Sequence, residues 1–230
     1  MERLYRIAGL TVQMDTFGRT EKLAEPYLCE KAPVDLVIRP DHADVQAKNP
    51  GISASHCEYL ASGASFYQQL MPFDAMLLHA AAVVVDGKAY LFTAPRKTGK
   101  STHVQLWLDV FGDRAVILNE DKPALRRIDG VWYAFGTPWS GKTGRNTNLQ
   151  VPIGGIAVLE RAEENAIEPY PGAMALGHLL QQTVRPANPA GSIRLLELMD
   201  SLLRQVPVWK LYCNMDRSAA ELAHKTMSGQ

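Results

Sequence analysis

A lysine-containing loop near the middle of the chain has residue types that bind phosphate. The segment FTAPRKTGKST (residues 92–102) ends in Gly99-Lys100-Ser101, the last three positions of the motif G-x-x-x-x-G-K-[ST]. Such a loop presents successive backbone N–H groups at the positive end of a helix. Lys100 would reach terminal phosphate oxygens, and the Ser101 hydroxyl would ligand Mg²⁺.

The loop departs from this motif at its beginning. Ala94 stands where the motif has glycine, and Arg96 and Lys97 add two cations. The extra methyl group of Ala94 is a modest change, whereas a side chain at Lys97 costs roughly 1 kcal/mol or more if that position needs positive φ. Arg96 and Lys97 either offset this cost through charge-assisted contacts to phosphate or are solvated cations. The candidate phosphate-binding residues are Ala94, Pro95, Arg96, Lys97, Thr98, Gly99, Lys100, Ser101 and Thr102.

Two acids follow the loop at a spacing that suits phosphoryl transfer. Glu120 and Asp121 come about twenty residues after Lys100, at the end of a predicted strand over 114–121. This interval holds a helix, a short loop and the next strand, so we expect the acids at the end of a strand neighbouring the loop. Adjacent like charges raise one pKa, which suits a general base. The alternative is a pair of solvated acids.

A glycine-rich segment over 139–150 is the third candidate element. Trp139, Lys142 and Arg145 place an aromatic ring and two cations beside the acids, and nearby glycines make the segment mobile. It could close over a phosphoryl group or a peptide acceptor, or be an ordinary surface loop.

The other histidines and the cysteines carry less signal. His103 follows the loop and either contacts a nucleotide or, as we favour, is a partly exposed helix residue. His42, His178 and His224 have no partner in sequence. The cysteines, Cys29, Cys57 and Cys213, form no C-x-x-C pair, so we expect reduced thiols and a cytoplasmic protein.

The elements that must position these residues are predicted mainly over 76–230. Asp86-Gly87 suits a tight type I′ turn and predicts a first hairpin, and a second hairpin is predicted to turn at Asp129-Gly130. We expect a helix over 101–111, a buried strand over 153–161, and helices near 172–183 and 192–205. A strand over 206–213 and a helix from Asp216 complete the chain.

Residues 1–75 are predicted to form an α+β lead-in subdomain. Strand-like stretches cover 4–14 and 34–40, and the polar stretch 41–51 is predicted to be a turn-rich link. Residues 55–70 have helical spacing, which Gly63 weakens.

The composition of the chain limits the classes of binding partner that we expect. Lys+Arg and Asp+Glu are both 24, so there is no basic surplus for a nucleic-acid binder. No segment approaches the ~20 apolar residues of a membrane span, and the N-terminus lacks a signal-peptide-like apolar run. We therefore expect no nucleic acid and no membrane among the partners, and leave a homo-oligomer open.

The segments LLHAAAVVVDGKAYLFTAPRKTGKST and VILNEDKPAL together resemble the HPr kinase/phosphorylase family and the related phosphoenolpyruvate carboxykinase. The chain is most similar to short bacterial HPr-kinase-like proteins, some of which phosphorylate a serine of a peptide. The resemblance covers about residues 76–160. It implies an α/β fold with a mixed-sheet P-loop nucleotide-binding core.

The resemblance also implies roles for individual residues. Lys100 and Ser101 match the family's phosphate and Mg²⁺ residues, and His79 matches a histidine near the acceptor. Glu120 and Asp121 fall on an Asp-Asp pair, whose first member is the base and whose second lies near the metal. Glutamate in the first position leaves open which acid is the base.

These observations together predict ATP- and Mg²⁺-dependent phosphoryl transfer to a hydroxyl, with a serine of a peptide or small protein as the acceptor. GTP or pyrophosphate as the donor stays open. The alternatives are a non-catalytic nucleotide or phosphate sensor with an altered loop, and a phosphate-removing phosphorylase or hydrolase of the same fold. A carboxykinase-like enzyme is disfavoured by chain length.

Overall fold

Two hairpins closed by Asp-Gly turns form much of the larger sheet. The structure, a computed structural model, describes residues 3–229. Asp86 and Gly87 have φ of 49° and 74°, and Asp129 and Gly130 have φ of 49° and 81°. Both turns therefore have the two positive φ values of a type I′ turn, which the sequence predicted for the first.

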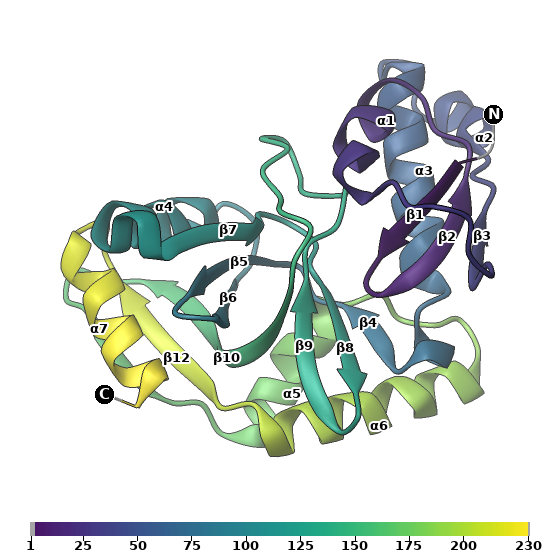
Figure 1. Cartoon of the computed structure of the whole chain (residues 1–230). Coiled ribbons are helices and arrows are strands. Elements are labelled where there is room, and N and C mark those ends of the chain that lie inside the picture. The colour runs from purple at the N-terminus through teal and green to yellow at the C-terminus, as the bar shows by residue number, and fades with distance from the viewer. Residues whose placement is uncertain (1–2, 230) are drawn as a thin grey trace.

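The larger sheet has nine strands and mixes parallel with antiparallel pairs (Figure 1). Its main path has the order β4-β8-β9-β10-β6-β5-β7, β12 pairs with β10, and β11 pairs with β12. The strands are β4 (Ala75–Leu77), β5 (Ala80–Val85), β6 (Lys88–Thr93), β7 (Ala115–Asn119), β8 (Ala124–Ile128), β9 (Val131–Phe135), β10 (Gln150–Arg161), β11 (Ala166–Pro169) and β12 (Val208–Cys213).

Strand β10 gives this sheet its curl. Its first residues, 150–152, pair antiparallel with β9, whereas its later residues pair parallel with β6 and β12. The register shifts between Ile153 and Gly155, which bends the strand from one group of strands to the other. The fold is therefore mixed α/β with a curled mixed sheet.

Helices cover both faces of the larger sheet, and β5 shows why. Successive strand residues point to opposite faces. Ala80, Ala82 and Val84 belong to the buried cluster that includes α5 and α6 residues, whereas Ala81, Val83 and Val85 belong to the one that includes α4 and α7 residues. The helices are α4 (Lys100–Phe111), α5 (Gly172–Gln181), α6 (Pro189–Gln205) and α7 (Arg217–Ser228). The expected Asp216 cap is confirmed, because its side chain accepts from the Ser218 N–H at 2.9 Å.

The N-terminal segment forms a smaller α+β body beside the larger sheet (Figure 1). It contains a separate sheet of order β1-β2-β3. Its elements are β1 (Arg3–Ile7), β2 (Leu10–Met14), α1 (Gly18–Ala24), β3 (Leu36–Ile38), α2 (His42–Lys48) and α3 (Ala54–Gln68). The predicted turn-rich link over 41–51 is wrong, since α2 forms there with the Asp41 side chain accepting from the Asp44 N–H at 3.0 Å.

One buried cluster continues from this body into the larger one. It joins Tyr5 and Phe66 to Phe135 and Trp139. The subdomain boundary at residue 75 stays a prediction.

Gly63 makes this junction between the bodies dense. A Cβ atom at Gly63 would lie 2.7 Å from Trp139 Cδ1. Trp139 is 1% exposed, stacks on Phe66 with centroids 4.8 Å apart, and donates to Ser62 Oγ at 3.1 Å. The glycine that weakened the helix prediction therefore makes room for an indole ring.

Gly63→Ala is expected to lower the free energy of unfolding by about 1–2 kcal/mol. Overpacking against Trp139 should outweigh the helix propensity that alanine gains. Gly177→Ala is the matched control, because Gly177 also lies in a helix and the rest of the described residues leave open space around its Cβ position. Denaturant unfolding should show Gly177→Ala neutral or stabilised. An equal effect of the two changes would contradict the packing role of Gly63.

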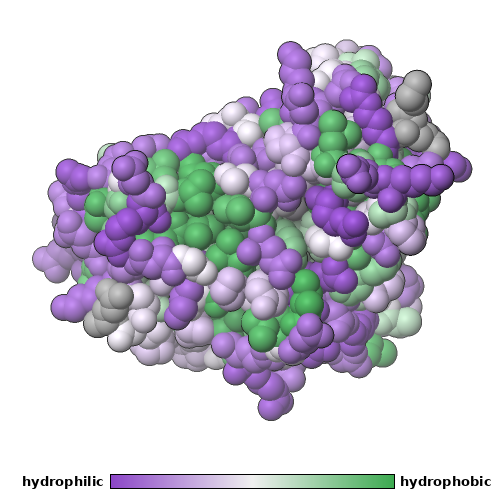
Figure 2. Space-filling view, in the orientation of Figure 1, coloured by the Kyte–Doolittle hydropathy of each residue, from purple (hydrophilic) through white to green (hydrophobic). Residues whose placement is uncertain are grey.

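On the face shown in Figure 2, apolar residues gather toward the middle of the larger body, and hydrophilic residues dominate its rim. Among the described residues, no helix combines the length and the apolar character required to traverse a lipid bilayer.

Candidate functional site

The 94–99 loop joins β6 to α4 in the predicted strand–loop–helix order. Lys97 has φ of 65° and Gly99 has φ of 123°, so the loop uses left-handed backbone at a lysine as well as at a glycine. Gly99 caps α4 without a side-chain hydrogen bond. The first N–H groups of this helix are therefore not covered by a capping side chain, as an anion site requires.

Lys100 lies folded back onto this loop. Its Nζ donates to the Ala94 carbonyl at 2.9 Å. Burial lowers the pKa of Lys100, and the charge of Asp121 acts in the opposite direction. Arg96 and Lys97 are exposed, whereas Ala94 is fully buried.

Arg161 braces the same loop from the end of β10. Its Nε donates to the Thr98 carbonyl at 2.9 Å, and its guanidinium also bonds to the Lys97 carbonyl. These two bonds hold the strained Lys97 segment from the adjacent parallel strand.

Arg161→Gln is expected to loosen the loop without unfolding the protein. Arg161 is exposed, so its loss should change global stability by less than about 1 kcal/mol. Hydrogen exchange of the amides over 96–99 should accelerate several-fold, while the β6 core amides should not change. Unchanged exchange across the loop would show that Arg161 does not brace it.

Strand order brings the acids toward the loop. The acids were predicted to end a strand that neighbours β6, and this prediction is wrong. They follow β7, and β5 lies between β6 and β7 and is antiparallel to both. The ends of β6 and β7 therefore share one edge. Ala80 pairs with Thr93, and its N–H donates to the Asp121 carbonyl at 3.2 Å. His79, the preceding residue, thus lies between the loop and the acids.

His79 and Asp121 contact each other at this edge. His79 Nε2 lies 3.2 Å from Asp121 Oδ1, and His79 Nδ1 lies 3.0 Å from Gln182 Oε1. Lys122 Nζ contacts the other Asp121 oxygen at 2.8 Å. Burial opposes ionisation of Asp121, but the His79 hydrogen bond and the Lys122 charge together hold its pKa well below the usual range.

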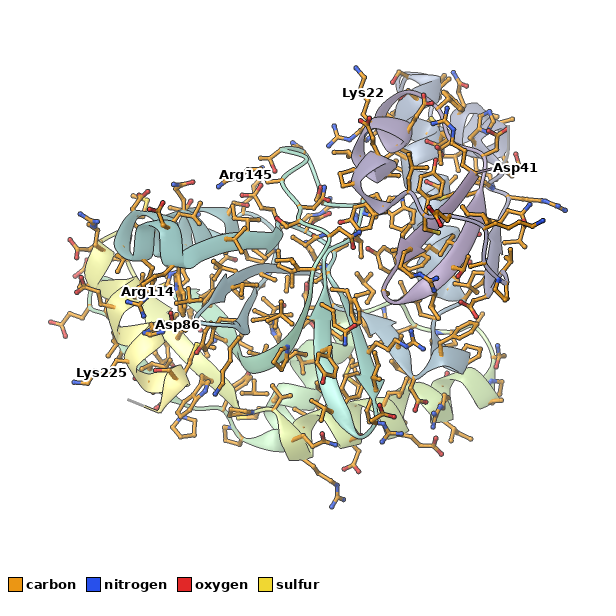
Figure 3. All side chains as sticks on the ribbon, in the orientation of Figure 1. Lys22, Asp41, Asp86, Arg114, Arg145 and Lys225 are labelled. Carbon is orange, nitrogen blue, oxygen red and sulfur yellow. The ribbon has the colours of Figure 1, made fainter. Side chains whose placement is uncertain are left out.

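Glu120 points into a different environment from Asp121. Its side chain is 3% exposed, and one oxygen lies 3.2 Å from Arg145 Nη1. The Thr143 hydroxyl donates to its other oxygen. Both carboxylate oxygens therefore hold the glycine-rich segment, on which Arg145 lies between the two bodies (Figure 3).

Hydrogen bonds to residues of α1, α3 and α4 hold this glycine-rich segment in place. Arg19 donates to the carbonyls of Gly141 and Lys142, and the Gly141 N–H donates to Tyr59 Oη at 2.9 Å. Arg145 Nη1 also donates to Gln105 Oε1, on α4, at 3.1 Å. The smaller body thus fixes the segment beside Asp121.

Two expectations about side chains need correction. Trp139, expected as an aromatic ring beside the acids, is buried in the junction between the bodies, because Phe66 and Gly63 offer it an apolar slot. Lys142 and Arg145 are exposed. His103, expected to be partly exposed, is 2% exposed because it packs against Phe92.

Sequence reasoning missed several residues at this site, because their partners are distant in the chain. They are Arg19, Arg161, His178 and Gln182. His178 Nε2 lies 3.5 Å from Thr93 Oγ1. Burial lowers the pKa of His178, and the charges of Lys210 and Lys100 lower it further. The helical periodicity of 172–183 was the available signal, but it does not tell which face meets the loop.

Comparison with known proteins adds little. No family model matches the chain, and no curated protein matches it. Among solved structures, the chain is similar to the Hpr(Ser) kinase/phosphatase from Coxiella burnetii, with a TM-score of 0.34 and 15% sequence identity over 65% of this chain and 95% of that one.

Proposed function

We propose that this protein transfers a phosphoryl group from Mg²⁺-bound ATP to a hydroxyl acceptor, a serine of a peptide or small protein. The observation that carries the proposal is the shared sheet edge: the 94–99 loop ends β6, the acids follow β7, and His79 lies between them. Phosphoryl transfer needs a cradle for the phosphates and a group that receives the acceptor proton.

In this proposal Lys100 exchanges its bond to the Ala94 carbonyl for a bond to the terminal phosphate. The charge-assisted bond is the stronger of the two, so phosphate binding favours the exchange. The uncapped first turn of α4 supplies further N–H donors. Arg161 keeps the loop in shape while Lys100 moves.

Asp121 with His79 is the pair that we assign to the acceptor proton. The low pKa keeps Asp121 ionised, so it can orient His79 and stabilise its charged form. Glu120 holds Thr143 and Arg145 and becomes a positioning residue. The sequence alone left the choice between the two acids open.

The residues fit Mg²⁺ as a partner of the nucleotide rather than as a separate metal centre. Within residues 3–229, no cluster of three or more His, Cys, Asp or Glu side chains could hold a metal ion. Mg²⁺ commonly uses one or two protein oxygens together with water and substrate phosphates. Ser101 and the ionised Asp121 are the side chains that would hold it, and the ion would neutralise charge on the phosphates.

The test combines binding with turnover. Calorimetry with Mg²⁺ and ATP measures binding, and mass spectrometry measures phosphorylation of a degenerate library of serine-containing peptides. Transfer to serine together with ADP release supports the proposal. Binding with neither ADP release nor transfer would identify a sensor, and phosphate released into water would identify a hydrolase.

The sensor is the second candidate, and the loop itself favours it. Lys97 has the positive φ at which glycine is most easily accommodated, and its side chain is exposed beside the phosphate position. A phosphate site can keep its affinity with such a loop while positioning the terminal phosphate too loosely for transfer.

A further inference from the structure

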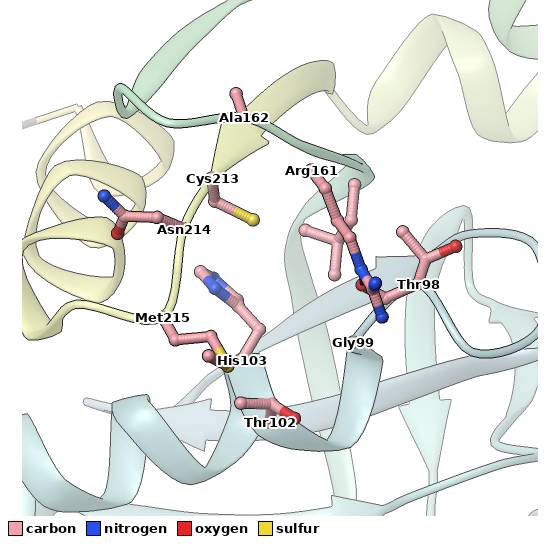
Figure 4. Close-up of a pocket in the computed structure, with 10 residues that line it drawn as sticks. Thr98, Gly99, Thr102, His103, Arg161, Ala162, Cys213, Asn214 and Met215 are labelled. Atoms are coloured by element: carbon pink, nitrogen blue, oxygen red, sulfur yellow. Dashed lines mark hydrogen bonds between the residues drawn. The ribbon is translucent and has the colours of Figure 1, made fainter.

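A cavity lies on the other side of the 94–99 loop from the acids. It measures about 290 Å³ and is bordered by the loop, the first turns of α4, the end of β10 and the segment after β12 (Figure 4). Its walls include Thr98, His103, Leu159, Arg161, Ala162, Cys213 and Met215. His79, Glu120 and Asp121 do not line it.

The sheet order explains this separation. Strands β10 and β12 lie on one side of β6, whereas β5 and β7 lie on the other. The loop that follows β6 therefore has the cavity on its β10 side and His79 with Asp121 on its β5 side. A ligand that lies along the loop would have one end in the cavity and the other end near His79 and Asp121.

His103, which lines this cavity, carries a buried hydrogen-bonding group without a partner. Its Nε2 lies 3.1 Å from Trp107 Nε1. An indole nitrogen only donates, so His103 Nε2 accepts, and the proton of the neutral imidazole is on Nδ1. Its Nδ1 is buried and has no hydrogen-bond partner among the described residues.

An unpaired buried donor is costly, and a ligand that accepts from it gains accordingly. The rest of the wall suits a flat heteroaromatic ring: Leu159, Ala162 and Met215 are apolar, and Met215 is 79% exposed at the rim. The Arg161 guanidinium lies on the loop side of the cavity, beside Thr98 (Figure 4). Apolar walls with a few convergent polar groups are typical of small-molecule sites.

We infer that this cavity is a nucleobase subsite, in which His103 Nδ1–H donates to a ring nitrogen or carbonyl oxygen of the base. This inference rests on the proposed function, since the phosphates of the same nucleotide would lie on the 94–99 loop. The base would then be on the β10 side and the terminal phosphate toward Asp121.

The experiment compares ATP with inorganic tripolyphosphate, each with Mg²⁺, by calorimetry. Tripolyphosphate has the phosphates without the base. Wild type should bind ATP at least about tenfold more tightly than tripolyphosphate. His103→Leu should reduce that ratio several-fold, and His103→Asn, which keeps a donor near the Nδ1 position, should restore part of it.

A second variant keeps the inference testable if the substitutions at the buried His103 prevent the protein from folding. Cys213→Trp fills the cavity from its wall, because the Cys213 side chain points into it (Figure 4), and leaves the backbone bond from Ala162 N–H to the Cys213 carbonyl. It should lower ATP affinity to about that of tripolyphosphate without changing tripolyphosphate affinity. Ala173→Trp, at an exposed position of α5, is the control and should change neither.

Three outcomes would overturn the inference, and they are distinguishable. Equal affinities of wild type for ATP and tripolyphosphate, or an affinity ratio that survives both His103→Leu and Cys213→Trp, would remove the base subsite and leave the phosphate site intact. Absence of binding by either ligand would instead overturn the proposed function, and the subsite with it.

Discussion

Lys100→Ala is expected to weaken binding of Mg²⁺-ATP by about 10- to 150-fold. The change removes a charge-assisted phosphate contact worth roughly 1.5–3 kcal/mol. The position supports this magnitude, since Lys100 is half-buried at the uncapped start of α4 and already reaches back across the loop to Ala94. Solvent would screen such a contact less than one on the open surface.

Lys225→Ala is the matched control for this experiment. Lys225 is an exposed lysine on α7, away from the loop (Figure 3). Calorimetry on the two variants and wild type should show a loss for Lys100→Ala alone. Equal affinities in all three folded proteins would exclude a phosphate site at the 94–99 loop. Circular dichroism and a thermal melt establish that the variants are folded.

Asp121→Asn should lower the rate of phosphoryl transfer by about 10²- to 10⁴-fold. Asparagine is neutral, so it can no longer stabilise a charged His79 through the 3.2 Å contact. At saturating Mg²⁺, ATP affinity should change by less than about threefold, because Lys100 and the α4 N–H groups carry most of the binding. The rate of ADP release in the presence of a serine-containing acceptor measures the effect.

Glu120→Gln separates the roles of the two acids. Glutamine can still accept from Thr143 but loses the ion pair with Arg145. We therefore expect a smaller rate loss than for Asp121→Asn, together with faster hydrogen exchange over 141–146. The opposite order of rate losses would make Glu120 the base.

A magnesium titration tests the other role of Asp121. If Asp121→Asn raises the Mg²⁺ concentration needed for half-maximal rate and spares the rate at saturating Mg²⁺, Asp121 acts only as a metal ligand and not on the acceptor proton. The double variant Asp121→Asn with His79→Gln tests whether Asp121 and His79 act together. Residues that act as one unit give losses that are far from additive, whereas independent residues give losses that multiply.

Much of the larger body could be predicted because its signals are local. The Asp-Gly turns need only two positive φ values at adjacent residues, and the strand–loop–helix around Lys100 lies within one short stretch. Helix α2 was missed, although Asp41 was available as a cap, because the polar composition of 41–51 outweighed it.

The residues that surround the two acids could not be predicted from local sequence patterns. Glu120 and Asp121 are adjacent in sequence, yet one holds Arg145 and the other holds His79. Successive side chains diverge as a strand ends, so their neighbours depend on which segments pass on each side. Trp139 likewise changed from an expected site residue into a core residue, because α3 offers it the space at Gly63.

The sequence by itself determined the elements and the order in which the chemistry follows them: a loop with Gly99, Lys100 and Ser101, then two acids after the next strand along the chain. Only the tertiary structure decided what surrounds them. It inserted β5 between the two strands, brought Arg161 to the loop, and set Arg19 beside Gly141. The physical reason is the separation of the interacting residues along the sequence. Turns and caps depend on residues a few positions apart, whereas these contacts join distant segments that meet only when the sheet and helices pack.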